Sequence, residues 1–165
     1  MKYCNRPWNT IEEHDAALIN NWNKKVGKND LIYILGDFSI STNNQRIIGY
    51  ANQLNGHKIL IKGNHDKNNM PEGLFDEITL YKEIYDFNYK IILFHYALEN
   101  WLGSFGKDLR GESNKKSSIH LHAHSHGLSS NRPNRYDVGV DSWNYEPVTL
   151  AEILNSERTR QLNGN

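Results

Sequence analysis

Four apolar runs in this sequence each lead into a polar residue that could bind a metal ion. The run LIYIL at 31–35 leads into Gly-Asp-Phe, and KILI at 58–61 leads into Gly-Asn-His-Asp. The run IILF at 91–94 ends on a histidine, and IHLHAHSHG at 119–127 contains four histidines. Short apolar runs bounded by turn residues predict buried β-strands. The chain is therefore expected to fold so that several strands carry polar side chains at their ends.

Helices are predicted between the strands of the first half. Residues 10–26 begin with the capping-box pair Thr10 and Glu13 and continue with apolar residues at helical spacing. Residues 44–54 predict a second helix, which stops at Asn-Gly. A strand, a helix and a strand in succession favour a parallel pair with a crossover helix.

The second half of the chain is expected to be mainly β. Two packed sheets with helices outside would accommodate both halves. With 165 residues the chain fits a single domain, residues 1–165. The expected elements are strands at 78–87 and 89–96 joined by a turn near Asn88, strands at 119–123 and 135–141, and a short helix at 149–156.

Composition argues against several kinds of partner. The 19 basic and 19 acidic side chains balance, so no bulk charge draws the protein to nucleic acid or membrane. No apolar run approaches the roughly 20 residues of a membrane span, and the N-terminus lacks the apolar region of a signal peptide. The single cysteine, Cys4, allows no internal disulfide. We therefore expect a cytoplasmic protein without a membrane partner, and the sequence leaves the oligomeric state open.

The strand-end residues form a candidate metal site. Functional groups of α/β sheets gather beyond the carboxyl ends of strands. Mixed carboxylate, amide and imidazole ligands suit Mn, Fe, Zn or Ni better than Ca or Mg. Each motif also has an ordinary explanation, since Gly-Asp is a common turn and the histidines could be a solvated patch. The joint order of the motifs favours a metal site among the strand-end residues, which are Asp37, Asn64, His65, Asp66, His95, His124 and His126.

On these motifs the sequence resembles the calcineurin-like metallophosphoesterases, particularly their small bacterial and phage members. The matching pieces are Gly-Asp-Phe at 36–38, Gly-Asn-His-Asp at 63–66, His95 and Ala-His-Ser-His-Gly at 123–127, and the segment 136–150 is also similar. The resemblance covers nearly the whole chain. It implies an α/β fold, a four-layer α/β/β/α sandwich of two mixed sheets with flanking helices.

The resemblance further implies a metal-dependent phosphoester hydrolase with a dinuclear centre that activates water. Asp37 would bridge two divalent transition-metal ions. Asn64, His95 and His124 would complete one metal site, and His126 would bind the other ion. Two such ions clamp phosphate oxygens and activate water for in-line attack.

Two residues would act on the substrate. The resemblance implies that His65 serves as general acid or stabilises the transition state, and that Asp66 orients it. The substrate would be a phosphoester, with nucleic acid only as a possible example. The sequence does not distinguish monoesters from diesters.

The sequence departs from the family pattern at its start. The family opens with a strand that ends in Asp-x-His, and no Asp-x-His precedes Asp37 here. We therefore expect the first strand to be missing and the ion at His126 to be weak or absent. The alternative function is an N-terminally truncated, catalytically impaired metal-binding remnant with one intact site. A nucleic-acid-binding module has little support, because the chain has no basic excess.

Three residues outside these motifs have weaker claims. Arg6 could contact phosphate bidentately, although a surface position is the commoner role for such a residue. Asp137 and Asp141 flank a glycine-containing strand, and we expect both to be structural.

Overall fold

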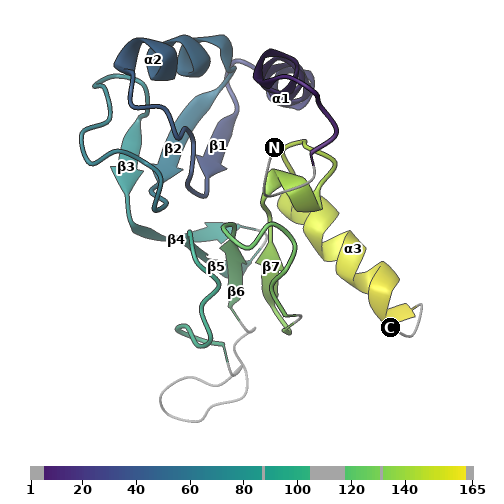
Figure 1. Ribbon diagram of the computed structural model, residues 1–165. Helices are drawn as coiled ribbons and strands as arrows, with labels where there is room; N and C mark the ends of the chain where they lie inside the picture. The colour runs from purple at the N-terminus through teal and green to yellow at the C-terminus, as the bar shows by residue number, and fades with distance from the viewer. Residues whose placement is uncertain (1–5, 87, 105–117, 131, 163–165) are drawn as a thin grey trace.

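The computed structural model describes residues 6–86, 88–104, 118–130 and 132–162, which form two β-sheets with flanking helices (Figure 1). This arrangement confirms the predicted α/β fold class. Within the described residues, no helix is both long and apolar enough to cross a membrane. The elements in chain order are α1 (Ile11–Lys25), β1 (Leu31–Ile34), α2 (Asn44–Gln53), β2 (His57–Ile61), β3 (Glu77–Thr79), β4 (Tyr81–Asp86), β5 (Tyr89–Phe94), β6 (Ile119–His122), β7 (Arg135–Asp137), the short 3-10 helix η1 (Val140–Ser142) and α3 (Leu150–Leu162).

Helix α1 begins at the predicted position because its capping box is formed. The Glu13 N–H donates to Thr10 Oγ1 at 3.1 Å, and the Thr10 N–H donates to Glu13 Oε2 at 3.3 Å. The burial of its side chains differs from what the apolar spacing predicts. Ile11 is 48% exposed, whereas His14 is buried. Helix α1 therefore buries a polar group, which needs hydrogen-bond partners inside the protein.

The chain leaves one sheet and enters the other in the middle of a predicted strand. We expected one strand over 78–87, but β3 pairs in parallel with β2, and β4 pairs antiparallel with β5 in the second sheet. Leu80 lies between them and is 64% exposed. The prediction was wrong because this segment has continuous strand propensity and no glycine or proline to mark the change. The β4–β5 turn is as expected, with Asn88 left-handed at φ 64°.

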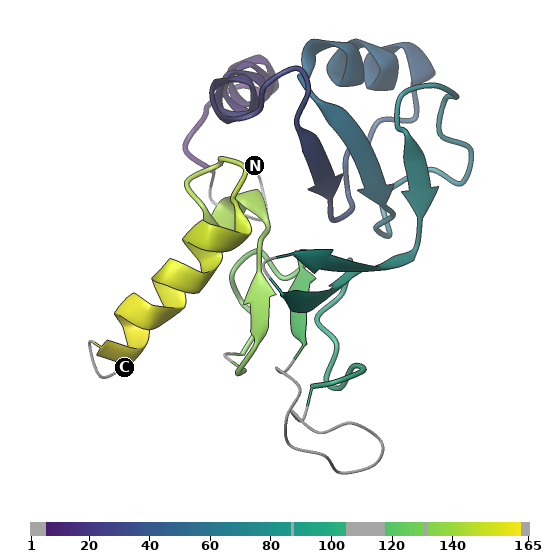
Figure 2. The ribbon, with the colours of Figure 1, turned by 180° about the vertical axis from the view of Figure 1, so that it is seen from behind.

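The two sheets share one apolar core. The four-stranded sheet, β4-β5-β6-β7, is mixed as expected, but the three-stranded sheet, β1-β2-β3, is wholly parallel in the described residues, where a mixed sheet was expected. Figure 2 shows α1 and α2 at the end of the three-stranded sheet away from the other sheet, and α3 beside β7. Among the described strands β1 pairs with β2 alone. The core consists of Leu35, Ile59, Ile61, Ile91, Leu93, Ile119 and Leu150.

Two of the four clustered histidines belong to the interior. His120 and His122, on β6, are 0% and 1% exposed, so the solvated-patch explanation is wrong for them. The Leu98 N–H donates to His120 Nε2 at 3.0 Å, and His120 Nδ1 lies 3.1 Å from the Ile92 carbonyl oxygen. A nitrogen that accepts and a nitrogen that donates describe a neutral imidazole. Burial lowers the pKa of His120 to about 4.

This buried histidine predicts a loss of stability in mild acid. The ordinary pKa of histidine is near 6.5, and the pKa of His120 in the folded protein is about 4. At a pH between these two values His120 is protonated in the unfolded chain but not in the folded protein. The contribution of neutral His120 to the free energy of unfolding is therefore fully present above pH 6.5. As the pH drops toward 4 this contribution is lost, and the free energy of unfolding falls by about 3 kcal/mol. His122 and Arg135 face the same ring and oppose its protonation.

Urea unfolding at several pH values between 7 and 4.5 checks this expectation. His120→Gln is expected to flatten the slope, while His57→Ala, a change at a histidine whose side chain is 61% exposed, keeps it. Equal slopes for the unchanged chain and His120→Gln would contradict the assignment.

Candidate metal centre

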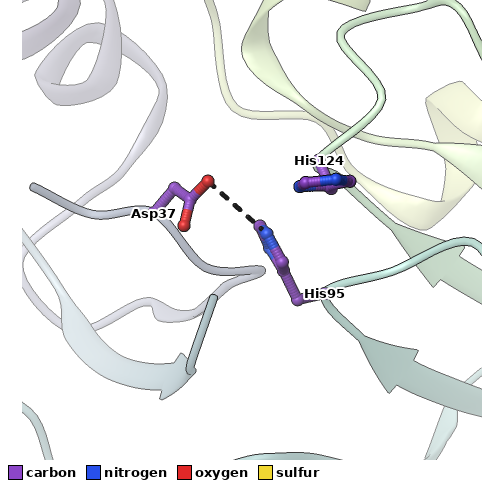
Figure 3. A group of neighbouring side chains, drawn as sticks. All are labelled: Asp37, His95 and His124. Atoms are coloured by element: carbon purple, nitrogen blue, oxygen red, sulfur yellow. Dashed lines mark ion pairs between the residues drawn. The ribbon is translucent and has the colours of Figure 1, made fainter. Parts of the chain in front are cut away.

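Three of the predicted ligands converge where the ends of the two sheets meet. Asp37 follows β1, His95 follows β5 and His124 follows β6, and each offers a ligand atom within 4.8 Å of the others (Figure 3). The strands bring together residues that are far apart in the sequence, because β1 and β2 are parallel, as are β5 and β6. Asn64, after β2, joins them through His95. The cluster thus has the mixed oxygen and nitrogen ligands that transition metals accept.

His95 is held so that one ring nitrogen faces the cluster. Its Nδ1 lies 2.7 Å from the Leu35 carbonyl oxygen, which can only accept, so Nδ1 carries a proton. Its Nε2 lies 3.1 Å from Asn64 Oδ1 and 3.5 Å from Asp37 Oδ2. The His95 side chain is 1% exposed and cannot turn away to solvent. A backbone carbonyl that fixes one nitrogen and frees the other is a common arrangement around metal-binding histidines.

His124 completes the cluster from the more open side. Its ring lies edge-on to His95, with ring centroids 5.0 Å apart, and to Tyr96, at 4.7 Å. These contacts orient the imidazole, although the residue as a whole is exposed. An oriented but accessible ring suits a ligand at a site that substrate must reach.

The backbone is strained at several of these positions. Asp37, His124 and His126 have φ angles of 54°, 61° and 47°, in the left-handed region that residues with a Cβ rarely adopt. Each such residue costs roughly 1–3 kcal/mol and persists only where neighbouring structure enforces it. Strain of this kind gathers at functional sites, and here it falls on three of the predicted ligands.

Two glycines allow the loops after β1 and β2 to touch each other. A Cβ built on Gly63 would lie 2.3 Å from Asp37 Oδ1 and 2.7 Å from His95 Cε1. A Cβ on Gly36, whose φ is 88°, would lie 2.3 Å from His95 Nδ1. Only glycine fits at both places. The Gly-Asp and Gly-Asn-His-Asp motifs therefore carry their glycines so that Asp37, Asn64 and His95 can approach.

Asp66 ties these two loops together. Its carboxylate accepts hydrogen bonds at 2.8 Å from the backbone N–H groups of Asp37, Phe38 and Gly63. The residue is 7% exposed. These contacts run to the backbone, so the predicted orientation of His65 by Asp66 stays a prediction. The loop-joining role was not predicted, because the partners of a carboxylate cannot be read from spacing alone.

Asp137 does the same for the loop that carries His124 and His126. Its carboxylate accepts from Ser125 Oγ at 2.9 Å and from the backbone N–H groups of Gly127 and Gly139 at 2.8 Å. The expectation that Asp137 is structural agrees with these contacts. Each half of the candidate centre thus has its own carboxylate that fixes the backbone.

The remaining predicted residues surround the cluster. His65 is exposed, and its backbone N–H donates to Asp37 Oδ1 at 2.9 Å. His126 lies outside the 4.8 Å group, and its Nδ1 is 2.7 Å from Asp141 Oδ2. Burial raises the pKa of Asp141, but hydrogen bonds from Arg6 and His126 outweigh this and lower the pKa below its usual value. Arg6 is not an isolated surface residue, because its guanidinium group donates two hydrogen bonds to the carboxylate of Asp141.

Comparison with known proteins identifies a family and several relatives of this chain. The model of the calcineurin-like phosphoesterase family matches residues 8–147 of this chain. An uncharacterized protein of Methanocaldococcus jannaschii is 33% identical over 161 residues, which cover 93% of this chain and 81% of that protein. The gene 66 protein of Mycobacterium phage D29 is 24% identical over 166 residues, covering 86% and 81%. These matches confirm the resemblance on which the ligands were assigned.

A solved structure also matches. The crystal structure of a protein of unknown function from Aquifex aeolicus has a TM-score of 0.63 and 25% sequence identity, and the match covers 89% of this chain and 87% of that one. The similarity therefore extends well beyond a single motif.

Proposed function

Because this chain belongs to the calcineurin-like phosphoesterase family, we propose that it hydrolyses phosphoesters with divalent metal ions held by its strand-end residues. The family is one of metal-dependent phosphoester hydrolases, and the described residues include a group that could hold a metal ion. The observation that carries the proposal is the convergence of ligand atoms of Asp37, His95 and His124, which lie within 4.8 Å of one another.

A cation bound among these ligand atoms would interact favourably with all of them. With Nδ1 donating to the Leu35 carbonyl oxygen, His95 has Nε2 available as a metal ligand. Asn64 Oδ1 lies 3.1 Å from that nitrogen and Asp37 Oδ2 lies 3.5 Å from it, and both oxygens can bind a metal ion. Carboxylate and amide oxygens beside an imidazole nitrogen form a ligand set that transition metals accept. A divalent ion would satisfy all three, so the donor set fits a metal.

The proposed assignment follows from this fit. Asp37, Asn64, His95 and His124 would hold one ion, and Asp37 and His126 would contribute to a second. Bound divalent ions would supply Lewis-acid activation of water and neutralise phosphate charge. The mixed ligand set favours Mn, Fe, Zn or Ni over Ca or Mg.

The chain itself would position and protonate the substrate. His65 is exposed and follows Asn64 in the sequence. Its backbone N–H donates to Asp37, and this hydrogen bond does not involve the imidazole ring. We assign it the role of proton donor or charge stabiliser at the phosphoester. Asp66 fixes the two loops between which the phosphate would lie, and orientation of His65 by Asp66 is part of the proposal.

One observation favours a second candidate, a protein that binds a single ion without turnover. His126 lies outside the group formed by Asp37, His95 and His124. A second ion would then depend on fewer protein ligands than the three usual at catalytic zinc sites. Metal stoichiometry and turnover separate the two candidates.

The test is a metal titration of chelator-treated protein. Mn²⁺ and Zn²⁺ are added separately, bound metal is measured by mass spectrometry, and hydrolysis of an aryl phosphate monoester and diester is followed. We expect His95→Ala to weaken binding of the first ion by more than about 100-fold, beyond the loss typical of residues that only support ligands. Turnover should fall with it.

His57→Ala is the matched control, since His57 lies at the opposite end of β2 from Asn64. Two ions with turnover support the dinuclear enzyme, and one ion without turnover supports the second candidate. Metal binding that is unchanged in His95→Ala would overturn both.

A further inference from the structure

A chain of hydrogen bonds runs from helix α1 to His126. It passes from Asp15 through His14, Arg6 and Asp141, and these residues come from three separate segments. We propose that Asp141 is a positioning residue for His126, and that Arg6 holds Asp141 in place for this task. The proposal deepens the proposed function, on which it rests through the assignment of His126 as a metal ligand.

The contact between His126 and Asp141 selects one form of the imidazole. His126 Nδ1 lies 2.7 Å from Asp141 Oδ2, and a carboxylate accepts, so Nδ1 donates. The proton on Nδ1 leaves the lone pair on Nε2, the nitrogen that points away from Asp141. A carboxylate behind a ligating histidine fixes the tautomer and the ring direction and makes the ring a better ligand.

Such a support is needed at this position. The His126 side chain is 45% exposed, and its backbone is left-handed at φ 47°. Contact with a fixed acceptor restricts the rotamers and tautomers that an exposed ring can sample. The Asp141 side chain is only 10% exposed, so it offers the His126 ring a fixed acceptor.

Arg6 fixes the carboxylate itself. Arg6 Nε donates to Asp141 Oδ1 at 2.8 Å, and Arg6 Nη2 donates to Oδ2 at 2.9 Å. This bidentate contact sets the plane of the carboxylate, which a single lysine contact would not do. The Arg6 side chain is 16% exposed, so water competes weakly. The oxygen that receives His126 therefore has a defined place.

Helix α1 orients Arg6 in turn. Arg6 Nη1 lies 2.6 Å from His14 Nε2 and, since arginine stays protonated, it donates to that nitrogen. His14 Nδ1 then donates to Asp15 Oδ1 at 2.7 Å. Trp8 packs edge-on against His14, with ring centroids 5.2 Å apart. The buried His14 of α1 thus accepts a hydrogen bond from Arg6 Nη1, while Nε and Nη2 of the same guanidinium donate to Asp141.

The same contacts would be present if Arg6 and Asp141 only linked the N-terminal segment to η1 and stabilised the fold. Such a structural role and a positioning role differ in their effect on His126. A structural link affects stability alone, whereas a positioning residue also fixes the tautomer of His126 and its affinity for metal. The ring nitrogens of histidine have distinct ¹⁵N chemical shifts in each tautomer, so the difference can be measured without metal.

The experiment compares Asp141→Ala and Asp141→Asn with the unchanged chain by ¹⁵N NMR of the histidine rings in metal-free protein. We expect His126 to carry its proton on Nδ1 in the unchanged chain and to become a mixture of tautomers in Asp141→Ala. Asp141→Asn keeps one accepting oxygen and should be intermediate. Asp76→Asn is the matched control, because Asp76 contacts His57 at 3.2 Å on the surface.

A Mn²⁺ titration of the same variants gives the second readout. We expect Asp141→Ala to weaken the second ion by about 10–100-fold and to leave the first ion unchanged. Arg6→Lys should have a smaller effect in the same direction. If His126 keeps a single Nδ1-protonated form in Asp141→Ala, the positioning role is wrong.

The two readouts separate this proposal from the proposed function. A tautomer that is lost in Asp141→Ala, in a chain that binds no second ion, supports the positioning role and removes the dinuclear centre. A second ion whose affinity is the same in Asp141→Ala and in Asp76→Asn overturns the positioning role and leaves the dinuclear centre in place.

Discussion

Replacement of His65 by alanine is expected to lower turnover about 10²–10⁴-fold and to leave metal content near that of the unchanged chain. The reason for this separation is local. His65 contacts Asp37 through its backbone N–H, at 2.9 Å from Oδ1, and alanine keeps that N–H. The exposed imidazole is lost, and with it the proposed proton donor or charge stabiliser at the phosphoester. Steady-state hydrolysis and metal analysis on the same sample check both halves of the expectation.

The matched control is again His57→Ala, an equal loss of an exposed ring on β2. Turnover should be unchanged there. A His65→Ala chain with full turnover would remove His65 from the mechanism. A parallel loss of metal would show that the residue supports the site and does not act on substrate.

The placing of the strand-end residues could be predicted from the sequence because it follows from periodicity. An apolar run that ends on Gly-Asp or Gly-Asn-His-Asp predicts both the strand and the end at which its polar residue lies. Parallel pairing then brings the ends of β1 and β2 together, and the structure places Asp37, His95 and His124 within reach of one ion.

The supporting residues could not be predicted in this way. Asp66 and Asp141 act through partners 29 and 135 residues distant, and no local pattern states such a pairing. The apolar spacing of α1 gives no sign that His14 is buried and contacts Arg6. The change of sheet at Leu80 has no turn residue to mark it. Contacts decided by tertiary packing leave little trace in sequence spacing.

Replacement of Asp66 by alanine is expected to lower the free energy of unfolding by about 3–5 kcal/mol. The carboxylate is 7% exposed and accepts from the backbone N–H groups of Asp37, Phe38 and Gly63. A buried N–H that loses its partner costs about 1–3 kcal/mol, and partial burial and relaxation of the loops keep the total for these three groups below the simple sum. In a chain of this size the melting temperature should fall by at least about 6 °C. Metal-free protein is used because bound metal would itself add stability.

Two further variants make the Asp66 expectation specific. In Asp66→Asn the amide oxygen can take the place of Oδ2 and keep the Asp37 and Gly63 contacts, but the NH₂ group then faces the N–H of Phe38. Its stability should therefore lie between those of Asp66→Ala and the unchanged chain. Asp76→Ala removes a carboxylate whose side chain is 56% exposed and should change little. If Asp66→Ala were as stable as Asp76→Ala, the loops after β1 and β2 would be held by the packing of Gly36 and Gly63 alone. Metal affinity should follow the same order as stability, because the carboxylate that joins the loops also sets the distance between Asp37 and His95.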